Sequence, residues 1–357
     1  MLRALYFDLS KKASGIIEND KNGYNNSSKI ILYSLISDGN INHAPTDMIT
    51  QGSEYMTDPD LFRCAKREII NRLVEKRTMK RIVSIQDISC VGKCSLTVAL
   101  PIISSMGVET SIVPTAVLST HTQFKGFTFR DLTDDMLPIL EHWKKEGFKF
   151  DAIYTGYLGS IRQIDIVKEY FKTFKSKKTA IVVDPAMADN GKLYVGFDDA
   201  FAKEMLSLCV KADITLPNIS EACLMLGEEY PGEEASDDVI CDLLKKLVKA
   251  GCKFPVITGV TLDNGTFGFI GLNSESGEFI SYGTTKVPYK SHGTGDVYAS
   301  AFTGALTLGK DVYTALKIAT DFTAASIRNT YEDPESVDYA VNFEAEIPYL
   351  LKLINEN

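Results

Sequence analysis

From about residue 79 to the end of the chain, short apolar runs alternate with longer segments whose apolar residues recur at helical spacing. The runs that predict strands are 81–86, 109–115, 151–156 and 179–184. The segments between them that predict helices include 94–107 and 161–175. This alternation indicates βαβ units and a parallel sheet covered by helices on both faces. Two later runs, 266–272 and 277–287, are separated by "NSES" and predict an antiparallel hairpin added to that sheet.

Residues 1–78 have a different pattern. They are rich in turn formers, as in "ENDKNGYNNSSK", and only residues 58–77 have the spacing of a helix. So few periodic apolar residues can bury little surface against the entropy of ordering the segment. We therefore divide the chain into a loop-rich N-terminal extension, 1–78, with one helix and no assigned function, and a main domain, 79–357. We expect the extension to lie outside the active site.

Composition excludes several classes of protein. With 45% hydrophobic and 24% charged residues the chain is close to globular averages, and no apolar run reaches the roughly 18–20 residues that span a bilayer. The seven cysteines are scattered and odd in number, which argues against a disulfide framework and indicates a reduced, cytoplasmic protein. A net charge of −9 argues against nucleic acid as a partner.

The stretch "KSHGTGDVYASAFTGALTLGK", residues 290–310, places glycines directly before a helix of small apolar residues. Gly293, Thr294 and Gly295 free the backbone to bend and let another molecule approach its amides, and a helix start receives anions readily. Asp296 could accept a proton beside such an anion site. The structural alternative is that the Thr and Asp side chains only cap the helix.

Other polar side chains follow the predicted strands, where ligands collect in parallel sheets. They are Tyr157, Asp184, Asp189, Tyr194, Asn218, Glu221 and Thr258. Asn218 and Glu221 also fit a helix capping box, and Tyr157 could be an ordinary half-buried aromatic residue. Together with the glycine-rich helix start, however, these side chains would hold metal ions and phosphate around one crevice. Phosphoryl transfer needs that combination, together with a group that takes the proton of the acceptor.

These motifs carry a resemblance. From Met79 onward the chain resembles the ribokinase-like superfamily, which has a three-layer α/β/α fold, and within it the pyridoxal (pyridoxine, pyridoxamine) kinases. The shared pieces, in the family's order, are "SIQD", "VLSTHTQF", "TGYLGS", "VVDPAM", "LPNISEA", "VITG" and "HGTGD". "GTGD" marks only the superfamily, whereas "STHTQF" with "GYLGS" is the more specific signature of vitamin B6 kinases.

The resemblance implies an ATP-dependent kinase that phosphorylates the 5′-hydroxymethyl group of a B6 vitamer. It implies that 293–295 form the anion hole, that Asp296 is the base and that Asp184 and Glu221 hold Mg²⁺. It places the remaining candidates along the substrates: Asp189, Tyr194, Asn218, Glu221 and Thr258 at ATP, and Asp87, Thr122 and Tyr157 at the vitamer. A monovalent cation such as K⁺ and a homodimer are further implications.

The chain departs from the family at two positions. Many members have Ser-His after the glutamine of "SIQD", whereas this chain has Asp87-Ile88, and Leu216 replaces a common hydroxyl residue. An acid at Asp87 would favour a cationic aminomethyl substituent, which points to pyridoxamine. Two other functions stay open. One is the related hydroxymethylpyrimidine kinase, which usually has cysteine in the place of Asp296, and the other is a B6-binding sensor without catalysis.

Overall fold

The structure is a computed structural model that describes residues 79–289, 292–337 and 339–356, all within one compact unit, Arg77–Asn357. Its strands are β1 (Arg81–Ser89), β2 (Glu109–Leu118), β3 (Phe129–Asp131), β4 (Ala152–Thr155), β5 (Ala180–Val183), β6 (Ala188–Asp189), β7 (Lys192–Leu193), β8 (Ile214–Thr215), β9 (Val256–Thr261), β10 (Phe267–Leu272) and β11 (Phe279–Thr284). Its helices are α5 (Leu96–Ser105), α6 (Thr133–Glu146), α7 (Ile161–Phe174), α8 (Asp199–Cys209), α9 (Ile219–Leu226), α10 (Asp237–Ala250), α11 (Thr294–Thr307), α12 (Val312–Glu332), the 3-10 turn η1 (Glu344–Glu346) and α13 (Ile347–Glu356). The helix expected at 58–77 lies outside the described residues.

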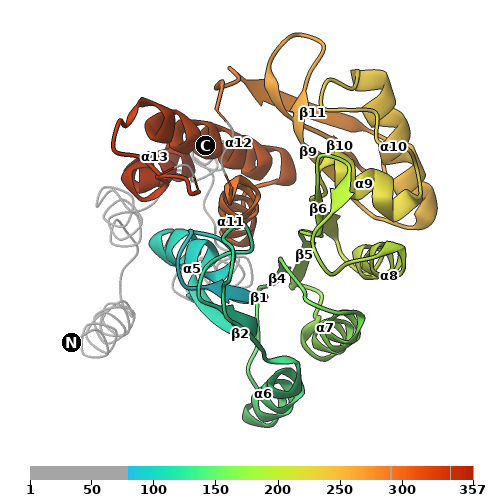
Figure 1. Ribbon diagram of the computed structural model, residues 1–357. Helices are drawn as coiled ribbons and strands as arrows, with labels where there is room; N and C mark the ends of the chain where they lie inside the picture. Colours follow the sequence, from blue (N-terminus) through green and yellow to red (C-terminus); the bar gives the residue numbers. More distant parts are fainter. Residues whose placement is uncertain (1–78, 290–291, 338, 357) are drawn as a thin grey trace, which may run out of the picture. The chain divides into compact units, whose positions relative to one another are not determined.

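The central sheet has the strand order β3-β2-β1-β4-β5-β8 (Figure 1). All its neighbouring pairs are parallel except β2 with β3, which are antiparallel at one edge. Parallel pairing brings the carboxyl ends of these strands to one edge of the sheet, where ligands collect. The expected mostly parallel sheet is confirmed.

The predicted hairpin is present as β10 and β11, but its place differs from the expectation. The two strands pair with β9 in a separate three-stranded sheet, β11-β10-β9. Only the isolated parallel bridges Thr215 to Pro255 and Asn218 to Thr258 join β9 to the region of β8. The second bridge matters for the site, because it sets two of the candidate residues beside each other.

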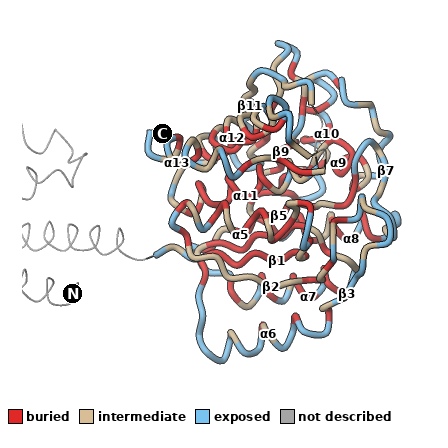
Figure 2. The backbone as a smooth tube through the Cα atoms, turned by 60° about the vertical axis from the view of Figure 1, so that its left-hand side comes forward, coloured by how far each residue is buried: buried red, intermediate tan, exposed pale blue. Residues whose placement is uncertain are grey.

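Helices cover both faces of the central sheet, as expected from the βαβ pattern (Figure 1). The apolar side chains of β1, β4 and β5 alternate between two clusters, since successive side chains of a strand point to opposite faces. One cluster packs against α6, α7, α8 and α10, and the other against α5, α11, α12 and α13. Figure 2 shows the strands as the buried centre of this unit and the outer helices as partly exposed. The three-layer α/β/α fold is confirmed.

Two strands are longer than predicted, and the added residues belong to the candidate site or lead to it. Strand β1 continues past Gln86 to Ser89, and its register with β2 shifts between Gln86 and Ile88. Asp87 lies at this irregularity, inside the strand rather than after it. Strand β2 likewise continues to Leu118 and carries the chain to the segment of His121 and Thr122.

Among the residues that the structure describes, none of the helices is both long and apolar enough to cross a bilayer.

Candidate active site

Helix α11 begins without any side-chain cap. Gly293 is its N-cap residue, with a left-handed φ of 77°, and the N–H of Val297 donates to the Gly293 carbonyl at 3.0 Å. Thr294, Gly295 and Asp296 therefore form the first helical turn, whose N–H groups have no acceptor within the helix. The alternative that Thr294 or Asp296 caps the helix is wrong. The open amides and the helix dipole make this a suitable seat for an anion.

Gly293 is also required by its surroundings. A Cβ atom at this position would lie 2.4 Å from the carbonyl oxygen of Lys93, closer than real Cβ contacts come. A Cβ atom at Gly295, by contrast, would meet no atom within 4 Å. One glycine of the motif thus permits tight packing of the protein against itself, while the other leaves space open next to the amides.

Asp296 lies deep in the protein, although its side chain keeps partial contact with solvent. Burial raises the pKa of Asp296 to about 7, a hydrogen bond with the backbone of Ser95 opposes the rise, and the negative charge of Asp87 adds to it. The positive end of the helix dipole favours the ionised form, but burial has the larger effect. A carboxyl group with a pKa near neutrality is well matched to general base catalysis.

Asp184 and Glu221 lie near Asp296, and burial disfavours the ionised form of these carboxyl groups as well. Burial raises the pKa of Asp184 well above its usual value, and the Glu221 and Asp296 carboxylates raise it further. Burial also raises the pKa of Glu221 to about 7, although backbone hydrogen bonds from Asn218 and Met187 oppose this. None of these carboxylates, nor that of Asp87, forms an ion pair within the described residues. A cation would relieve this repulsion.

The capping box at α9 is confirmed. The Glu221 N–H donates to Asn218 Oδ1 at 2.9 Å, and the Asn218 N–H donates to Glu221 Oε2 at 2.9 Å. Glu221 Oε1 accepts from the Met187 N–H at 3.1 Å, and Asn218 Nδ2 donates to the Ala188 carbonyl at 2.8 Å. Glu221 therefore fastens the loop after β5 to the start of α9 while its charge faces Asp184. Glu221 thus helps to cap helix α9 and is also one of the two residues expected to bind Mg²⁺.

Three residues expected along ATP, Asp189, Tyr194 and Thr258, lie in or next to β6, β7 and β9. Asp189 is exposed, and its two carboxylate oxygens accept from the backbone and side-chain nitrogens of Asn190 at 2.9 and 2.8 Å. Burial, followed by the Glu221 and Asp189 charges, raises the pKa of Tyr194. The N–H of Thr258 donates to the Pro217 carbonyl at 2.9 Å, which holds β9 against the start of α9.

Asp87 and Tyr157 come together, whereas Thr122 does not join them. Burial raises the pKa of Tyr157 to about 12, and the charge of Asp87 contributes to this rise. Burial also raises the pKa of Asp87, although the Ser95 and Ser89 hydroxyls oppose this by hydrogen bonding. The Ser89 hydroxyl donates to Asp87 Oδ2 at 2.9 Å. Thr122 is exposed and makes no hydrogen bond among the described residues.

The site fits Mg²⁺ only in combination with a phosphate ligand. Within the described residues no three His, Cys, Asp or Glu side chains are arranged to hold a metal ion on their own. Mg²⁺ commonly binds through one or two carboxylates, substrate phosphates and water. The buried carboxylates of Asp184 and Glu221, which form no ion pair with the described residues, suit that arrangement.

Sequence reasoning missed the segment of Gly92, Lys93, Cys94 and Ser95. Ser95 contacts both Asp87 and Asp296, and Lys93 packs against Gly293. Gly92 has a φ of 121°, and Lys93 and Ser95 have φ values of 50° and 54°, which non-glycine residues rarely adopt. Only the glycine in "VGKCS" could have indicated this turn, because positive φ at Lys or Ser leaves no mark in the sequence.

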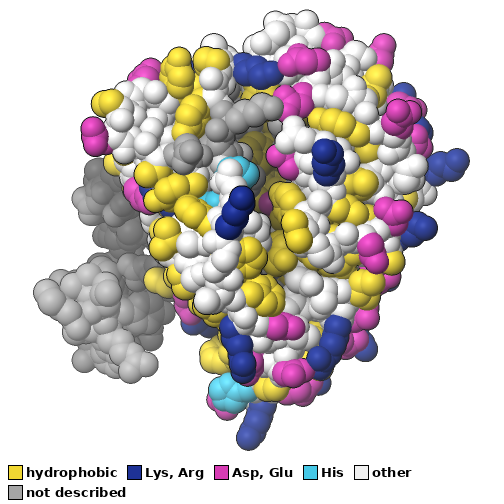
Figure 3. Space-filling model, viewed as in Figure 1, with side chains coloured by type: hydrophobic (Ala, Val, Ile, Leu, Met, Phe, Trp, Pro, Cys, Tyr) yellow, Lys and Arg dark blue, Asp and Glu magenta, His cyan; other side chains and the backbone are white. Residues whose placement is uncertain are grey.

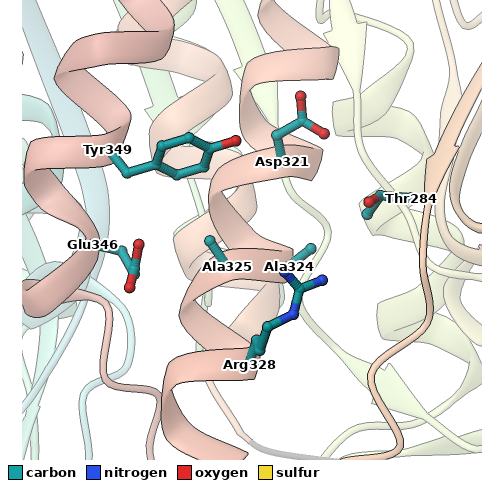
Figure 4. Close-up of a pocket in the computed structure, with 7 residues that line it drawn as sticks. All are labelled: Thr284, Asp321, Ala324, Ala325, Arg328, Glu346 and Tyr349. Carbon is teal, nitrogen blue, oxygen red and sulfur yellow. The ribbon is translucent and has the colours of Figure 1, made fainter.

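A polar pocket of about 230 Å³ lies between β11, α12 and the C-terminal turn (Figure 4). Its lining residues are Thr284, Asp321, Ala324, Ala325, Arg328, Glu346 and Tyr349. Thr284 is nine residues before Gly293, and Glu344, next to the pocket, pairs with Lys93 at 2.9 Å. Glu344 belongs to the same turn, η1, as the lining residue Glu346. Figure 3, drawn from the view of Figure 1, shows a hollow in the surface between α5 and α9, with histidine side chains beside it.

The family model described as phosphomethylpyrimidine kinase matches residues 100–338, about two thirds of the chain. The chain belongs to the phosphomethylpyrimidine kinase family. It is accordingly an ATP-dependent kinase, and the resemblance to ribokinase-like pyridoxal kinases is confirmed.

Relatives of this family member carry two kinds of name. A pyridoxine kinase of Bacillus subtilis is 28% identical over 191 residues, which cover 52% of this chain and 67% of the relative. A hydroxymethylpyrimidine/phosphomethylpyrimidine kinase of Aquifex aeolicus is 26% identical over 223 residues, which cover 61% of this chain and 82% of the relative. A crystal structure of a candidate phosphomethylpyrimidine kinase from Bacteroides thetaiotaomicron, in a form with pyridoxal, is 39% identical with a TM-score of 0.70 and covers 76% of this chain and 96% of that one.

Proposed function

We propose that this kinase transfers the terminal phosphoryl group of ATP to the 5′-hydroxymethyl group of a vitamin B6 vitamer. The observation that carries the proposal is a carboxylate of near-neutral pKa, Asp296, in the first turn of a helix with open N-terminal amides. A pure binding protein would gain nothing from a second negative charge beside an anion seat, which argues against a sensor. The pyridoxal present in the Bacteroides neighbour supports a pyridine substrate.

In the proposed reaction the hydroxyl proton of the acceptor passes to a carboxylate oxygen of Asp296. The new O–P bond forms as the bond from the γ-phosphorus to the bridging oxygen breaks, and ADP leaves with that electron pair. The amides of 293–295 face the transferring phosphoryl oxygens, where their charge is stabilised. Asp184 and Glu221 would hold Mg²⁺, which neutralises phosphate charge when bound. Turnover should therefore cease in a chelator and return with Mg²⁺.

The nucleotide would extend from the anion hole past the starts of α9 and β9. Asn218 and Thr258 lie side by side there, with Tyr194 and Asp189 across the loop from β5. We assign the base of ATP to the polar pocket of Figure 4, because the Tyr349 ring and several polar side chains line it. Arg328 lines the pocket and is exposed, so its guanidinium is available to a planar base.

The vitamer would lie between Asp87 and Tyr157, whereas a contact with Thr122 rests on the family resemblance alone. The buried Asp87 carboxylate forms no ion pair with any of the residues that the structure describes and so favours a cationic group, which makes the aminomethyl of pyridoxamine the preferred substituent. We expect Asp87→Ser to lower kcat/KM for pyridoxamine by about 5–30-fold while largely sparing pyridoxal. An unchanged ratio of the two kcat/KM values would show that Asp87 does not face this substituent.

The competing function is the phosphorylation of hydroxymethylpyrimidine, supported by the Aquifex relative. The deciding experiment measures kcat/KM for pyridoxal, pyridoxine, pyridoxamine and hydroxymethylpyrimidine with the purified full-length chain. We expect the highest value for a B6 vitamer. A hydroxymethylpyrimidine value at least tenfold above all three vitamers would replace the proposal with its competitor, and tight vitamer binding without ATP consumption would favour the sensor.

The family resemblance supports further properties that we include in the proposal: a homodimer, activation by a monovalent cation such as K⁺, a cytoplasmic location, and a catalytic unit that begins near Met79. Light scattering of the purified chain and turnover with Na⁺ in place of K⁺ test the first two. A chain that begins at Met79 should keep kcat/KM within about threefold.

A further inference from the structure

The loop of residues 92–95, "GKCS", is held in an unfavourable backbone conformation. Gly92, Lys93 and Ser95 have φ values of 121°, 50° and 54°. A non-glycine residue in such a region costs on the order of 1–3 kcal/mol, so it persists only where its surroundings hold it. Side-chain anchors of this loop are therefore part of what keeps it in place.

The loop contacts both parts of the proposed catalytic apparatus. The carbonyl of Lys93 packs so closely on Gly293 that no Cβ atom fits between them. Ser95 also lies beside both carboxylates, since its backbone lowers the pKa of Asp296 and its hydroxyl lowers the pKa of Asp87. A shift of residues 92–95 would consequently displace the anion hole and the base together.

The ammonium of Lys93 anchors the loop to the segment 339–344, which we call the brace. Lys93 Nζ lies 2.9 Å from Glu344 Oε2, 3.5 Å from Asn342 Oδ1 and 3.4 Å from the Val341 carbonyl oxygen. It also lies 5.8 Å from the centre of the Phe343 ring.

The brace is itself fixed to the end of α12. The Asn342 N–H donates to Thr330 Oγ1 at 2.8 Å, and Asn342 Nδ2 donates to Asp333 Oδ2 at 2.9 Å. The brace also reaches the loop that carries Thr122, since a ring nitrogen of His121 lies 3.1 Å from the Tyr339 carbonyl oxygen. Because three oxygens of a fixed segment already surround the Lys93 ammonium, this lysine is suited to holding the loop in place rather than to binding substrate.

We propose that Lys93 is a positioning residue, whose ion pair with Glu344 holds the loop 92–95 in place and thereby aligns Gly293 and Asp296. The inference rests on the site of the proposed function but not on the identity of the acceptor. A partly exposed ion pair contributes at most about 1 kcal/mol to folding, so its loss should hardly change stability. Misplacement of reacting groups by about 1 Å can cost on the order of 10²-fold in rate, so we expect a smaller shift to lower kcat about tenfold.

The test is a double-mutant cycle on the full-length kinase with Lys93→Met, Glu344→Gln and the pair. Each single variant should lose about tenfold in kcat with KM for ATP within twofold, and the pair should be no worse than either. Lys93→Arg should restore most of the activity. Lys168→Met, which removes the Lys168–Glu204 pair between α7 and α8, is the control and should leave kcat unchanged.

A second measurement does not depend on turnover. Hydrogen exchange of the Val98 and Ala99 amides should be at least tenfold faster in Lys93→Met than in the wild type, because both amides donate to the Ser95 carbonyl, at 3.0 and 2.9 Å. Unchanged kcat and unchanged exchange in Lys93→Met would overturn the proposal. A raised KM for ATP in Lys93→Met together with a normal KM for ATP in Glu344→Gln would also overturn it, because the lysine would then bind phosphate directly. If the wild type prefers hydroxymethylpyrimidine, the proposed function fails, but the cycle measured with that acceptor still decides this inference.

Discussion

Replacement of Gly293 by alanine separates backbone conformation from packing at the start of α11. Its φ of 77° costs an L-residue about 1–2 kcal/mol, and the new Cβ atom would lie 2.4 Å from the Lys93 carbonyl oxygen. Because real Cβ contacts essentially never fall below 3.0 Å, Lys93 or α11 must move by at least 0.6 Å. We expect a loss of about 2–4 kcal/mol in the free energy of unfolding and on the order of 10²-fold in kcat.

The assay is urea unfolding followed by the fluorescence of Trp143, the single tryptophan, together with steady-state kinetics at saturating ATP. Gly147→Ala is the matched control, because Gly147 has a φ of 74° at the end of α6 and a Cβ atom there meets nothing within 4 Å. The control should lose only about 1 kcal/mol and keep normal kcat. Equal losses of stability and activity in the two variants would refute the packing argument at Gly293.

Three further predictions concern the same site. Gly295→Ala should fold with normal or slightly higher stability, because a Cβ atom at this position meets no other atom within 4 Å. Its kcat/KM should fall more than tenfold, because the new methyl group would obstruct the phosphate. A normal kcat/KM would show that no ligand approaches Gly295. Burial and neighbouring carboxylates raise the pKa of Asp184, so the folded state binds a proton at this carboxyl group more tightly than the unfolded state does. The stability that this tighter proton binding contributes is lost as pH rises from about 4 through the folded pKa. In urea unfolding without Mg²⁺, Asp184→Asn should therefore match the free energy of unfolding of the wild type near pH 4 and exceed it at pH 8, and equal stability at pH 8 would contradict the pKa direction. Arg328→Ala should raise KM for ATP about tenfold with KM for the vitamer unchanged, and the reverse pattern would remove the base of ATP from that pocket.

The spacing of apolar residues along the sequence was sufficient to predict the α/β architecture. The apolar runs at 81–86, 151–156 and 179–184 lie within or around β1, β4 and β5, because strands buried on both faces must be apolar throughout. The glycines of "HGTGD" likewise predicted a bent backbone at a helix start, and Gly293 has that conformation.

Periodicity could not predict features that depend on contacts between distant segments. The strain at Lys93 and Ser95 is imposed by packing on Gly293 and by the brace, more than 190 residues later in the chain. The raised pKa values of Asp184 and Asp296 depend on burial, which a single sequence does not report. The separate sheet of β9, β10 and β11 was missed because hairpin signals do not specify which strand the hairpin joins.

The central claim is that Asp296 removes the acceptor proton beside the anion hole of α11. The most direct test is the turnover of pyridoxal and pyridoxamine with ATP by purified Asp296→Asn, with the dissociation constant of ATP measured on the same sample. The amide keeps the shape of the side chain but cannot accept the proton, so we predict a loss of at least about 10²-fold in kcat with ATP affinity within threefold. A folded Asp296→Asn protein that turns over at nearly the wild-type rate would contradict the claim.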